Sequence, residues 1–307
     1  MKKTRVVVIG VGAVGSTTAY TLLLRERADE LVLIDANQAK AVGDALDMNH
    51  GMPFVGQTKV WAGTYEDCAG ADIIIITAGA AQKPGETRVD LLKRNIAIYD
   101  SIVSEVLKYN EDGILLIATN PVDVMSYFCL RKSAWPTNRV IGSGTLLDSA
   151  RFRYLIGEEL ELDPRSVHAH IIGEHGDSEL PVWSLANVAG SQLKLDEEAK
   201  TRIYTNTRDA AYQIIEAKGA TYYAIALALD RIVTAILHNE AAVLNVSTLL
   251  NDYHGVSDVY LGVPCVVDRQ GVREVLDIVL TDEERTLLHK SADKLKSLIQ
   301  SIETAVG

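Results

Sequence analysis

The sequence predicts an α/β protein in which a doubly wound parallel sheet is followed by a second domain of mixed α and β structure. In the first half, short and continuously apolar runs alternate with amphipathic stretches, as in parallel strands that are buried on both faces and covered by helices. Beyond Gly142 this alternation gives way to longer amphipathic segments, without a flexible linker. We therefore expect one domain over residues 1–142 and another over residues 143–307.

The amino-terminal elements follow one another in an informative order. An apolar run at Val6–Ile9 leads through Gly10-Val11-Gly12-Ala13-Val14-Gly15 into an expected helix that ends at Leu24. The next apolar run, Leu31–Ile34, ends at Asp35, about 20 residues after the last glycine. Strand, glycine turn, helix, strand and acid are together the fingerprint of a Rossmann-type dinucleotide-binding domain.

Each position of this fingerprint has a physical role. Gly10 permits the tight turn, Gly12 lets the backbone approach a pyrophosphate, and Gly15 lets the helix pack closely on the strand. The helix start at Ala13 and Val14 offers unpaired N–H groups to the phosphates. A carboxylate at Asp35 would accept from both ribose hydroxyls and repel a 2′-phosphate, which favours NAD over NADP as the cofactor.

A rival interpretation of the same segment is a signal peptide or membrane anchor, because Lys2, Lys3 and Arg5 precede an uncharged run. Glycines and hydroxyl residues interrupt that run, whereas a spanning helix needs about 20 predominantly apolar residues. We reject the anchor and expect a cytoplasmic protein without a membrane segment.

Composition excludes several other classes. The chain has 307 residues and a formal net charge of −11, which argues against a basic nucleic-acid-binding surface. Cys68, Cys129 and Cys265 are scattered and without a C-x-x-C pair, so we expect reduced thiols, no disulfide framework and no metal site. Because the average field repels anions, placed arginines would have to bind an acidic substrate.

Further strands are expected at Ile73–Ile76, Ile114–Ile117 and Val140–Gly142. Ligands bind outside the carboxyl ends of such strands, so Ala78, Gly79 and Asn120 are candidate cofactor contacts, although Asn120 before proline is equally typical of a turn. In the second half we expect a strand over 167–172 with His168 and His170 on one face, and amphipathic segments over 208–237 and from 281 to the end. Thr281 and Glu284 form a capping box.

The candidate chemistry centres on His175, in Gly173-Glu174-His175-Gly176-Asp177, with Asp148 as its upstream partner. A histidine held by a carboxylate stores and returns one proton near neutral pH. Arg151 follows Asp148 at i, i+3, on the same helix face, and its planar fork suits a substrate carboxylate. Either element alone is more typical of a turn histidine or a surface ion pair; together they indicate chemistry on a small organic acid.

Residues 81–88 lie between the Ile73–Ile76 strand and the following helix. Their composition is that of a solvated loop, but their place at a strand tip favours a hinged lid that carries Arg88 into the site.

Motifs in these segments resemble the lactate/malate dehydrogenase family over essentially the whole chain, and its bacterial lactate-converting members in particular. The matching motifs are Gly10-x-Gly12-x-x-Gly15, Gln82-Lys83-Pro84-Gly85-Glu86-Thr87-Arg88, Ala118-Thr119-Asn120-Pro121-Val122-Asp123, Leu147-Asp148-Ser149-Ala150-Arg151-Phe152-Arg153 and Gly173-Glu174-His175-Gly176-Asp177. The resemblance implies an NAD-dependent oxidoreductase that needs no metal and is usually a homotetramer.

It also implies residue roles. His175 would protonate the keto oxygen of pyruvate as hydride arrives from NADH, giving L-lactate, and Asp148 would fix its tautomer and raise its pKa. Arg151 would hold the substrate carboxylate and Arg88 would polarise the carbonyl. Asn120 would bind the same oxygen or orient the histidine, and Thr221 would shape the pocket beside the nicotinamide.

Gln82 stands where malate-type members have an arginine, which favours pyruvate over oxaloacetate. Three alternatives stay open: a broader L-2-hydroxyacid dehydrogenase, a malate dehydrogenase and, more remotely, a catalytically silent NAD-binding protein. Arg153 and His168 match an Arg and a His that bind fructose 1,6-bisphosphate at a subunit interface in the bacterial members, so we expect an allosteric effector. On residues alone, they would be a helix-surface arginine and a polar-face histidine.

Overall fold

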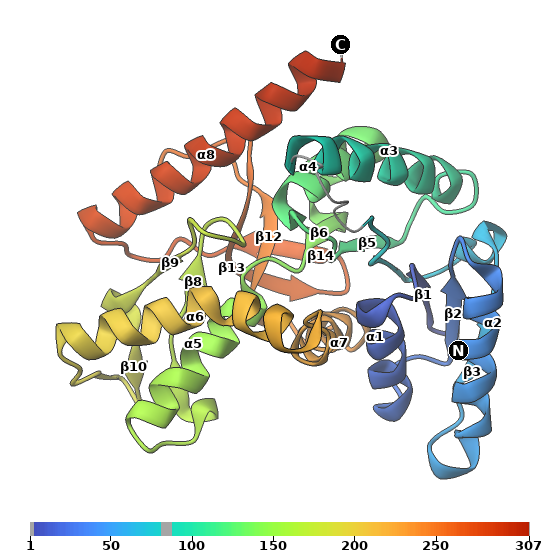
Figure 1. Cartoon of the computed structure of the whole chain (residues 1–307), viewed down its shortest axis with the longest axis horizontal. Helices are drawn as coiled ribbons and strands as arrows, with labels where there is room; N and C mark the ends of the chain where they lie inside the picture. Colours follow the sequence, from blue (N-terminus) through green and yellow to red (C-terminus); the bar gives the residue numbers. More distant parts are fainter. Residues whose placement is uncertain (1–2, 81–87, 307) are drawn as a thin grey trace.

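The largest sheet of the computed structural model, which describes residues 3–80 and 88–306, has nine strands in the order β14-β13-β12-β6-β5-β4-β1-β2-β3 (Figure 1). Its parallel part, β3-β2-β1-β4-β5-β6, has the strand order of a doubly wound dinucleotide-binding sheet. The bounds of these strands are Arg5–Ile9 (β1), Glu30–Ile34 (β2), Lys59–Ala62 (β3), Ile73–Ile76 (β4), Ile114–Ile117 (β5) and Val140–Gly142 (β6). The predicted α/β fold is confirmed.

Helices cover both faces of this sheet. Helices α3 and α4 pack together on one side, and α1 packs against α7 on the other (Figure 1). Because both faces are covered, all four isoleucines of β4 are fully buried, which explains the unbroken apolar run. The α-helices are Ala13–Leu24 (α1), Gln38–His50 (α2), Arg88–Val106 (α3), Val122–Ser133 (α4), Leu146–Glu159 (α5), Glu197–Lys218 (α6), Tyr223–Leu237 (α7) and Asp282–Val306 (α8). Short 3-10 helices span Met52–Phe54 (η1), Tyr65–Cys68 (η2), Thr137–Arg139 (η3), Pro164–Ser166 (η4) and Trp183–Leu185 (η5).

The sheet continues into the carboxy-terminal half of the chain. Strands β12 (Ala242–Leu249), β13 (Tyr260–Asp268) and β14 (Gly271–Val275) extend it as antiparallel strands, and β12 joins β6 where Ser247 faces Gly142. The sequence patterns did not predict these strands. One hydrophobic core therefore includes residues from both sides of the expected boundary at Gly142.

A second hydrophobic cluster lies between α5, α6 and several two-residue strands. Its buried members are Phe152, Ile156, Val167, Ala169, Ile171, Ala186 and Ile203. The small strands are Val167–His168 (β7), Ile171–Ile172 (β8), Leu180–Pro181 (β9), Asn187–Val188 (β10) and Ser191–Gln192 (β11).

The strand expected over 167–172 is divided between two sheets. Strand β7 pairs with β10, whereas β8 pairs with β9. Burial still alternates along the segment, with His168 exposed and His170 half-buried beside buried apolar neighbours, so the predicted face is present without a continuous strand. The change of partner strand at this point has no counterpart in the apolar pattern.

The structure divides one of the predicted helical segments and confirms the predicted start of another. The amphipathic segment over 208–237 is interrupted, because α6 ends at Lys218. Its C-cap, Gly219, has a φ of +84° and donates its N–H to the carbonyl of Ile215. The capping box before α8 is confirmed: Thr281 N donates to Glu284 Oε2 at 2.9 Å, and Glu284 N donates to Thr281 Oγ1 at 3.2 Å. Within the described ranges, no helix combines the length and apolar character that a membrane crossing requires.

Candidate active site

The turn between β1 and α1 leaves backbone space where a dinucleotide would need it. Gly10 has a φ of +92°, and a Cβ there would lie 2.5 Å from the backbone of Ala78. A Cβ on Gly15 would lie 1.9 Å from the carbonyl oxygen of Gly10. A Cβ on Gly12, by contrast, would meet nothing within 4 Å, so the turn presents open space at the helix start. These glycines fit the approach of a pyrophosphate.

Asp35 links the end of β2 to this turn. Its Oδ2 accepts from Val11 N at 2.7 Å and its Oδ1 accepts from Asn37 N at 2.8 Å. It borders a cavity of about 790 Å³ together with Gly10, Gly12, Ala78 and Gly79, at the carboxyl ends of β1, β2 and β4. Five predicted cofactor residues are thus gathered around one cavity, which lies at the topological switch point of the sheet.

Three other predicted cofactor residues, Ala13, Val14 and Asn120, do not border this cavity. Ala13 and Val14 open α1, with Ala13 exposed and Val14 half-buried. Asn120 is exposed in the segment between β5 and α4. The residues bordering the cavity do not include it.

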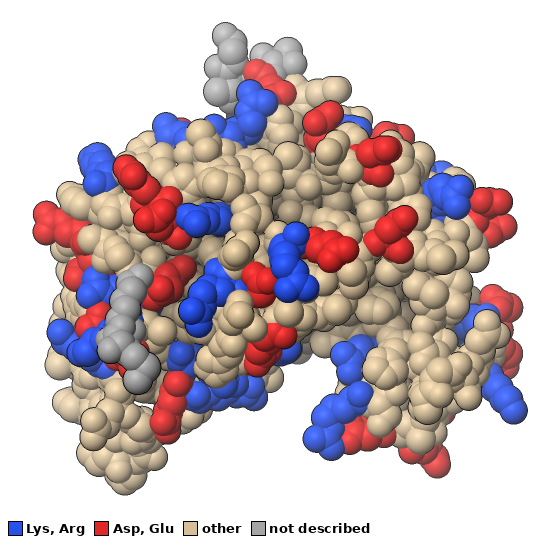
Figure 2. Space-filling model, turned by 180° about the vertical axis from the view of Figure 1, so that it is seen from behind, with Lys and Arg blue, Asp and Glu red and all other residues tan. Residues whose placement is uncertain are grey.

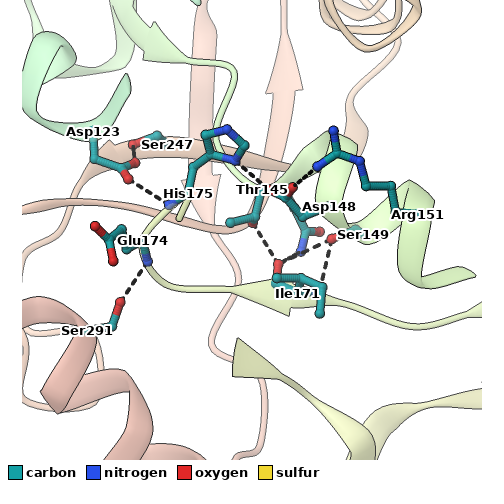
Figure 3. A network of polar contacts seen from close by, with 11 residues as sticks. Asp123, Thr145, Asp148, Ser149, Arg151, Ile171, Glu174, His175, Ser247 and Ser291 are labelled. Carbon is teal, nitrogen blue, oxygen red and sulfur yellow. Dashed lines mark hydrogen bonds and ion pairs between the residues drawn. The ribbon is translucent and has the colours of Figure 1, made fainter. Parts of the chain in front are cut away.

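His175, Asp148 and Arg151 come together around one carboxylate (Figure 3). His175 Nδ1 lies 2.5 Å from Asp148 Oδ2, and Arg151 Nη1 donates to Asp148 Oδ1 at 2.8 Å. Asp148 is buried on α5, where residues three apart share a face, and His175 lies in the loop after β8. The expected pairing of His175 with Asp148 is present, and it leaves the histidine Nε2 as the ring nitrogen that is available to a substrate.

Electrostatics favour a protonated histidine. Burial by itself would lower the pKa of His175, but the negative charge and hydrogen bond of Asp148 outweigh burial and raise this pKa to about 9. Burial would raise the pKa of Asp148, yet His175 and Arg151 lower it below its usual range. The pair therefore holds a carboxylate and an imidazolium near neutral pH, as a proton donor requires.

Two buried carboxyl groups beside this pair were not predicted as site residues. Asp123, in the first turn of α4, accepts from His175 N at 2.8 Å and from Ser247 Oγ at 2.6 Å. Burial raises the pKa of Asp123 to about 6, although these hydrogen bonds oppose the change. Glu179 is also buried, and burial followed by the Asp148 charge raises its pKa to about 9. Asp123 stood in a recognised motif; nothing local marked Glu179.

Thr221 and Arg151 border a second cavity, of about 630 Å³, lined by α5, α6 and α7. The predicted substrate residues Arg151 and Thr221 are thus brought together by elements that lie far apart in the sequence. Arg88 is the first residue of α3, and its side chain lies outside the described residues. Gln82 and the lid segment, residues 81–87, lie outside them as well.

The two predicted effector residues lie on either side of a half-buried histidine. Arg153, on α5, donates from Nη2 to the carbonyl oxygens of Pro164 and Arg165, each at 3.4 Å. Its buried Nε has no hydrogen-bond partner among the described residues. His168 is exposed on β7. Burial, followed by the charges of Arg153 and His168, lowers the pKa of His170, which places both residues in its neighbourhood.

Acidic and basic side chains are interspersed over the face shown in Figure 2. Because the whole chain has a formal net charge of −11, its average field provides no general attraction for an anionic substrate. In the part of the chain that the structure describes, no three His, Cys, Asp or Glu side chains are grouped to hold a metal ion. A dinucleotide-type sheet joined to a carboxylate-held histidine is typical of a nicotinamide-dependent oxidoreductase.

Comparison with known families agrees with this class. Residues 4–142 match the NAD binding domain of lactate/malate dehydrogenase, and residues 145–306 match its alpha/beta C-terminal domain. The chain therefore belongs to the lactate/malate dehydrogenase family. The predictions of the family and of NAD as the cofactor are confirmed.

Individual relatives cover nearly the full chain. It is 52% identical over 308 residues to an L-lactate dehydrogenase of Acetivibrio thermocellus, with 97% of each chain covered. It is 53% identical over 304 residues to an L-lactate dehydrogenase of Geobacillus stearothermophilus, with 96% of each covered. Among solved structures, a ligand-bound minor L-lactate dehydrogenase from Enterococcus mundtii is similar with a TM-score of 0.95 and 46% identity, covering 97% of this chain and 98% of that chain.

Proposed function

We propose that the protein is an L-lactate dehydrogenase that reversibly transfers hydride between NADH and pyruvate, giving L-lactate and NAD. The observation that carries this proposal is the buried carboxylate of Asp148, with His175 Nδ1 at 2.5 Å on one oxygen and Arg151 Nη1 at 2.8 Å on the other. Asp148 thus orients His175, the proton donor, and also contacts the guanidinium of Arg151, which can bind a substrate carboxylate. The names of the relatives support the same activity.

The amino-terminal cavity is the site for the cofactor. Gly10, Gly12 and Gly15 leave room for the pyrophosphate, the start of α1 at Ala13 and Val14 offers N–H donors, and Asp35 borders the ribose position. Ala78 and Gly79 form the rim at the end of β4. When bound there, NADH supplies the hydride.

His175 supplies the proton. Because Asp148 holds Nδ1, the proton on Nε2 points away from the pair and is transferred to the keto oxygen during reduction. In the reverse direction neutral His175 takes the proton from the lactate hydroxyl. Asp148 stays ionised throughout and stabilises the imidazolium.

The remaining roles concern substrate binding. Arg151 leaves its contact with Asp148 in part to hold the pyruvate carboxylate through two parallel hydrogen bonds. Arg88 polarises the carbonyl, Asn120 binds the same oxygen, and Thr221 shapes the pocket next to Arg151. Gln82, which lies outside the described residues, is neutral and offers no charge to a second carboxylate.

Organisation and regulation complete the proposal. Residues 1–142 form the NAD-binding domain and residues 143–307 the catalytic domain, in agreement with the two matched family segments. The protein is a cytoplasmic homotetramer; its three cysteines are free and buried, which suits a reducing compartment. Fructose 1,6-bisphosphate binds Arg153 and His168 at a subunit interface and relieves the repulsion between cations of neighbouring subunits.

A spectrophotometric assay of NADH oxidation with a panel of 2-oxo acids tests the proposed activity. We expect the highest kcat/KM for pyruvate. Preference for a longer aliphatic 2-oxo acid would indicate a broader L-2-hydroxyacid dehydrogenase, and preference for oxaloacetate a malate dehydrogenase. The absence of turnover with every acid would overturn the proposal.

A further inference from the structure

The loop that carries His175, residues 173–178, lies directly against the carboxy-terminal helix α8. Gly173 and Gly262 of β13 exchange backbone hydrogen bonds of 2.8 and 2.9 Å, which fix the start of the loop. Gly173 has a φ of +92°, and a Cβ added there would lie 2.9 Å from Ser291 Oγ on α8. The helix therefore packs onto the loop without space for a side chain between them.

Two successive backbone N–H groups anchor the loop to different helices (Figure 3). Glu174 N donates to the fully buried Ser291 Oγ of α8 at 2.7 Å. His175 N donates to Asp123 Oδ2 of α4 at 2.8 Å. The position of the His175 backbone thus depends on both helices, and its ring is then held by Asp148 of α5.

The Glu174 side chain adds a charged link to α8. Glu174 is buried, and its Oε2 accepts from Lys294 Nζ at 2.7 Å. The same oxygen accepts from Ser178 N at 3.1 Å and from Ser178 Oγ, so it also closes the loop on itself. Among the described residues, Lys294, whose side chain is 46% exposed, is the charged partner of this carboxylate, and the other donors to it, both from Ser178, are neutral.

We propose that α8 positions the proton-donating loop through the ion pair between Lys294 and Glu174, which makes Lys294 a positioning residue for the reaction. The inference rests on the proposed function of His175. Lys294 contacts the loop through this ion pair, with its Nζ 2.7 Å from Glu174 Oε2, so we expect it to act on catalysis through the position of the loop. Its replacement should therefore affect the chemical step more than the binding of either ligand.

Kinetics of Lys294→Ala test this inference. A misplacement of 1 Å costs about 10²-fold in rate, and because the anchors at Ser291 and Asp123 remain, we expect a smaller fall in kcat, about tenfold. The KM for NADH should stay within about twofold of wild type, because the cofactor cavity is formed by other elements. Lys294→Arg, which keeps the charge, should restore most of kcat.

Lys290→Ala provides the matched control, since Lys290 is exposed on the same helix, and it should leave kcat unchanged. In a Glu174→Gln background, Lys294→Ala should change kcat by less than about twofold because the partner charge is gone. Unchanged kcat in Lys294→Ala, no rescue by arginine, or an equal loss of NADH affinity would each overturn the inference.

If Lys294→Ala does not fold, as judged by thermal unfolding, Lys294→Met, which removes the charge and keeps the length of the side chain, carries the same test, with a fall in kcat expected and an unchanged kcat contradicting the inference. Wild-type protein is assayed in parallel. Lack of turnover in the wild type would count against the proposed function, whereas equal turnover in wild type and variant counts against the positioning role alone.

Discussion

Replacing Asp148 with Asn would remove the buried negative charge that faces His175 Nδ1 at 2.5 Å. That charge is the principal reason why the pKa of His175 is raised from 6.5 to about 9 despite burial, with smaller contributions from Asp123 and Glu179. One pKa unit is worth 1.36 kcal/mol, so the difference corresponds to about 3 kcal/mol in favour of the imidazolium. In Asp148→Asn we expect the pKa of His175 to fall to 6.5 or below.

The sign of the effect differs between the two directions. In the proposed role of His175 as proton donor, reduction of pyruvate needs the charged form, so wild-type kcat/KM should be constant below pH 9 and fall above it. With a pKa of 6.5 in the variant, the charged fraction at pH 8 is about 30-fold lower, before any cost of losing the correct tautomer. Oxidation of lactate needs neutral His175 and should show the opposite pH trend.

The assay is the pH profile of kcat/KM for pyruvate reduction, followed by NADH absorbance, in wild type and Asp148→Asn. Glu159→Gln is the matched control. Glu159 is the last residue of the same helix and is exposed, so this substitution also removes one acidic charge from α5. A variant whose profile retains the wild-type midpoint would refute the assignment of Asp148 as the group that sets the pKa of His175.

Three further predictions concern substrate and effector. Arg151→Lys keeps the charge but loses the bidentate fork, so binding of pyruvate should weaken by roughly 1.5–3 kcal/mol per lost charged hydrogen bond, and the KM for pyruvate should rise. An unchanged KM in steady-state kinetics would contradict the role of Arg151 in holding the substrate carboxylate. Gln82→Arg should raise the ratio of kcat/KM for oxaloacetate to that for pyruvate, and a ratio that does not move would exclude contact with the substrate tail. Fructose 1,6-bisphosphate should lower KM for pyruvate and strengthen the tetramer in wild type but not in Arg153→Gln; a response that survives this substitution would locate the effector elsewhere.

The parallel part of the fold could be predicted from the sequence because its strands are buried on both faces. Runs such as Ile73–Ile76 are continuously apolar, and the glycine turn after Val6–Ile9 has a strict local spacing. Strand β12 escaped prediction because Asn245 and Ser247 interrupt its apolar pattern. Both are buried, and both are satisfied by distant partners: Asn245 by His170 and Ile171, Ser247 by Asp123. The strand propensities of neighbouring residues do not reveal contacts with residues so far away in the sequence.

The candidate site divides in the same way. Asp148 and His175 could be paired from the sequence because a proton donor needs an orienting acid, and the structure places their side chains in contact. Asp123 reads locally as an acidic residue in the first turn of a helix, although its partners are His175 and Ser247. Glu174 likewise depends on α8, more than 100 residues away. Asp123 and Glu174 hold other residues in place, and nothing in the residues next to them in the sequence indicates that role.

The most direct test of the central claim, that His175 is the proton donor, compares pyruvate-dependent NADH oxidation by wild type and His175→Ala at pH 7, with NADH affinity measured by fluorescence titration. Loss of a general acid typically lowers the rate by about 10²–10⁴-fold. We predict a loss of kcat in that range with NADH affinity nearly unchanged, because the cofactor cavity does not include His175. Turnover by His175→Ala at the wild-type rate would contradict the account.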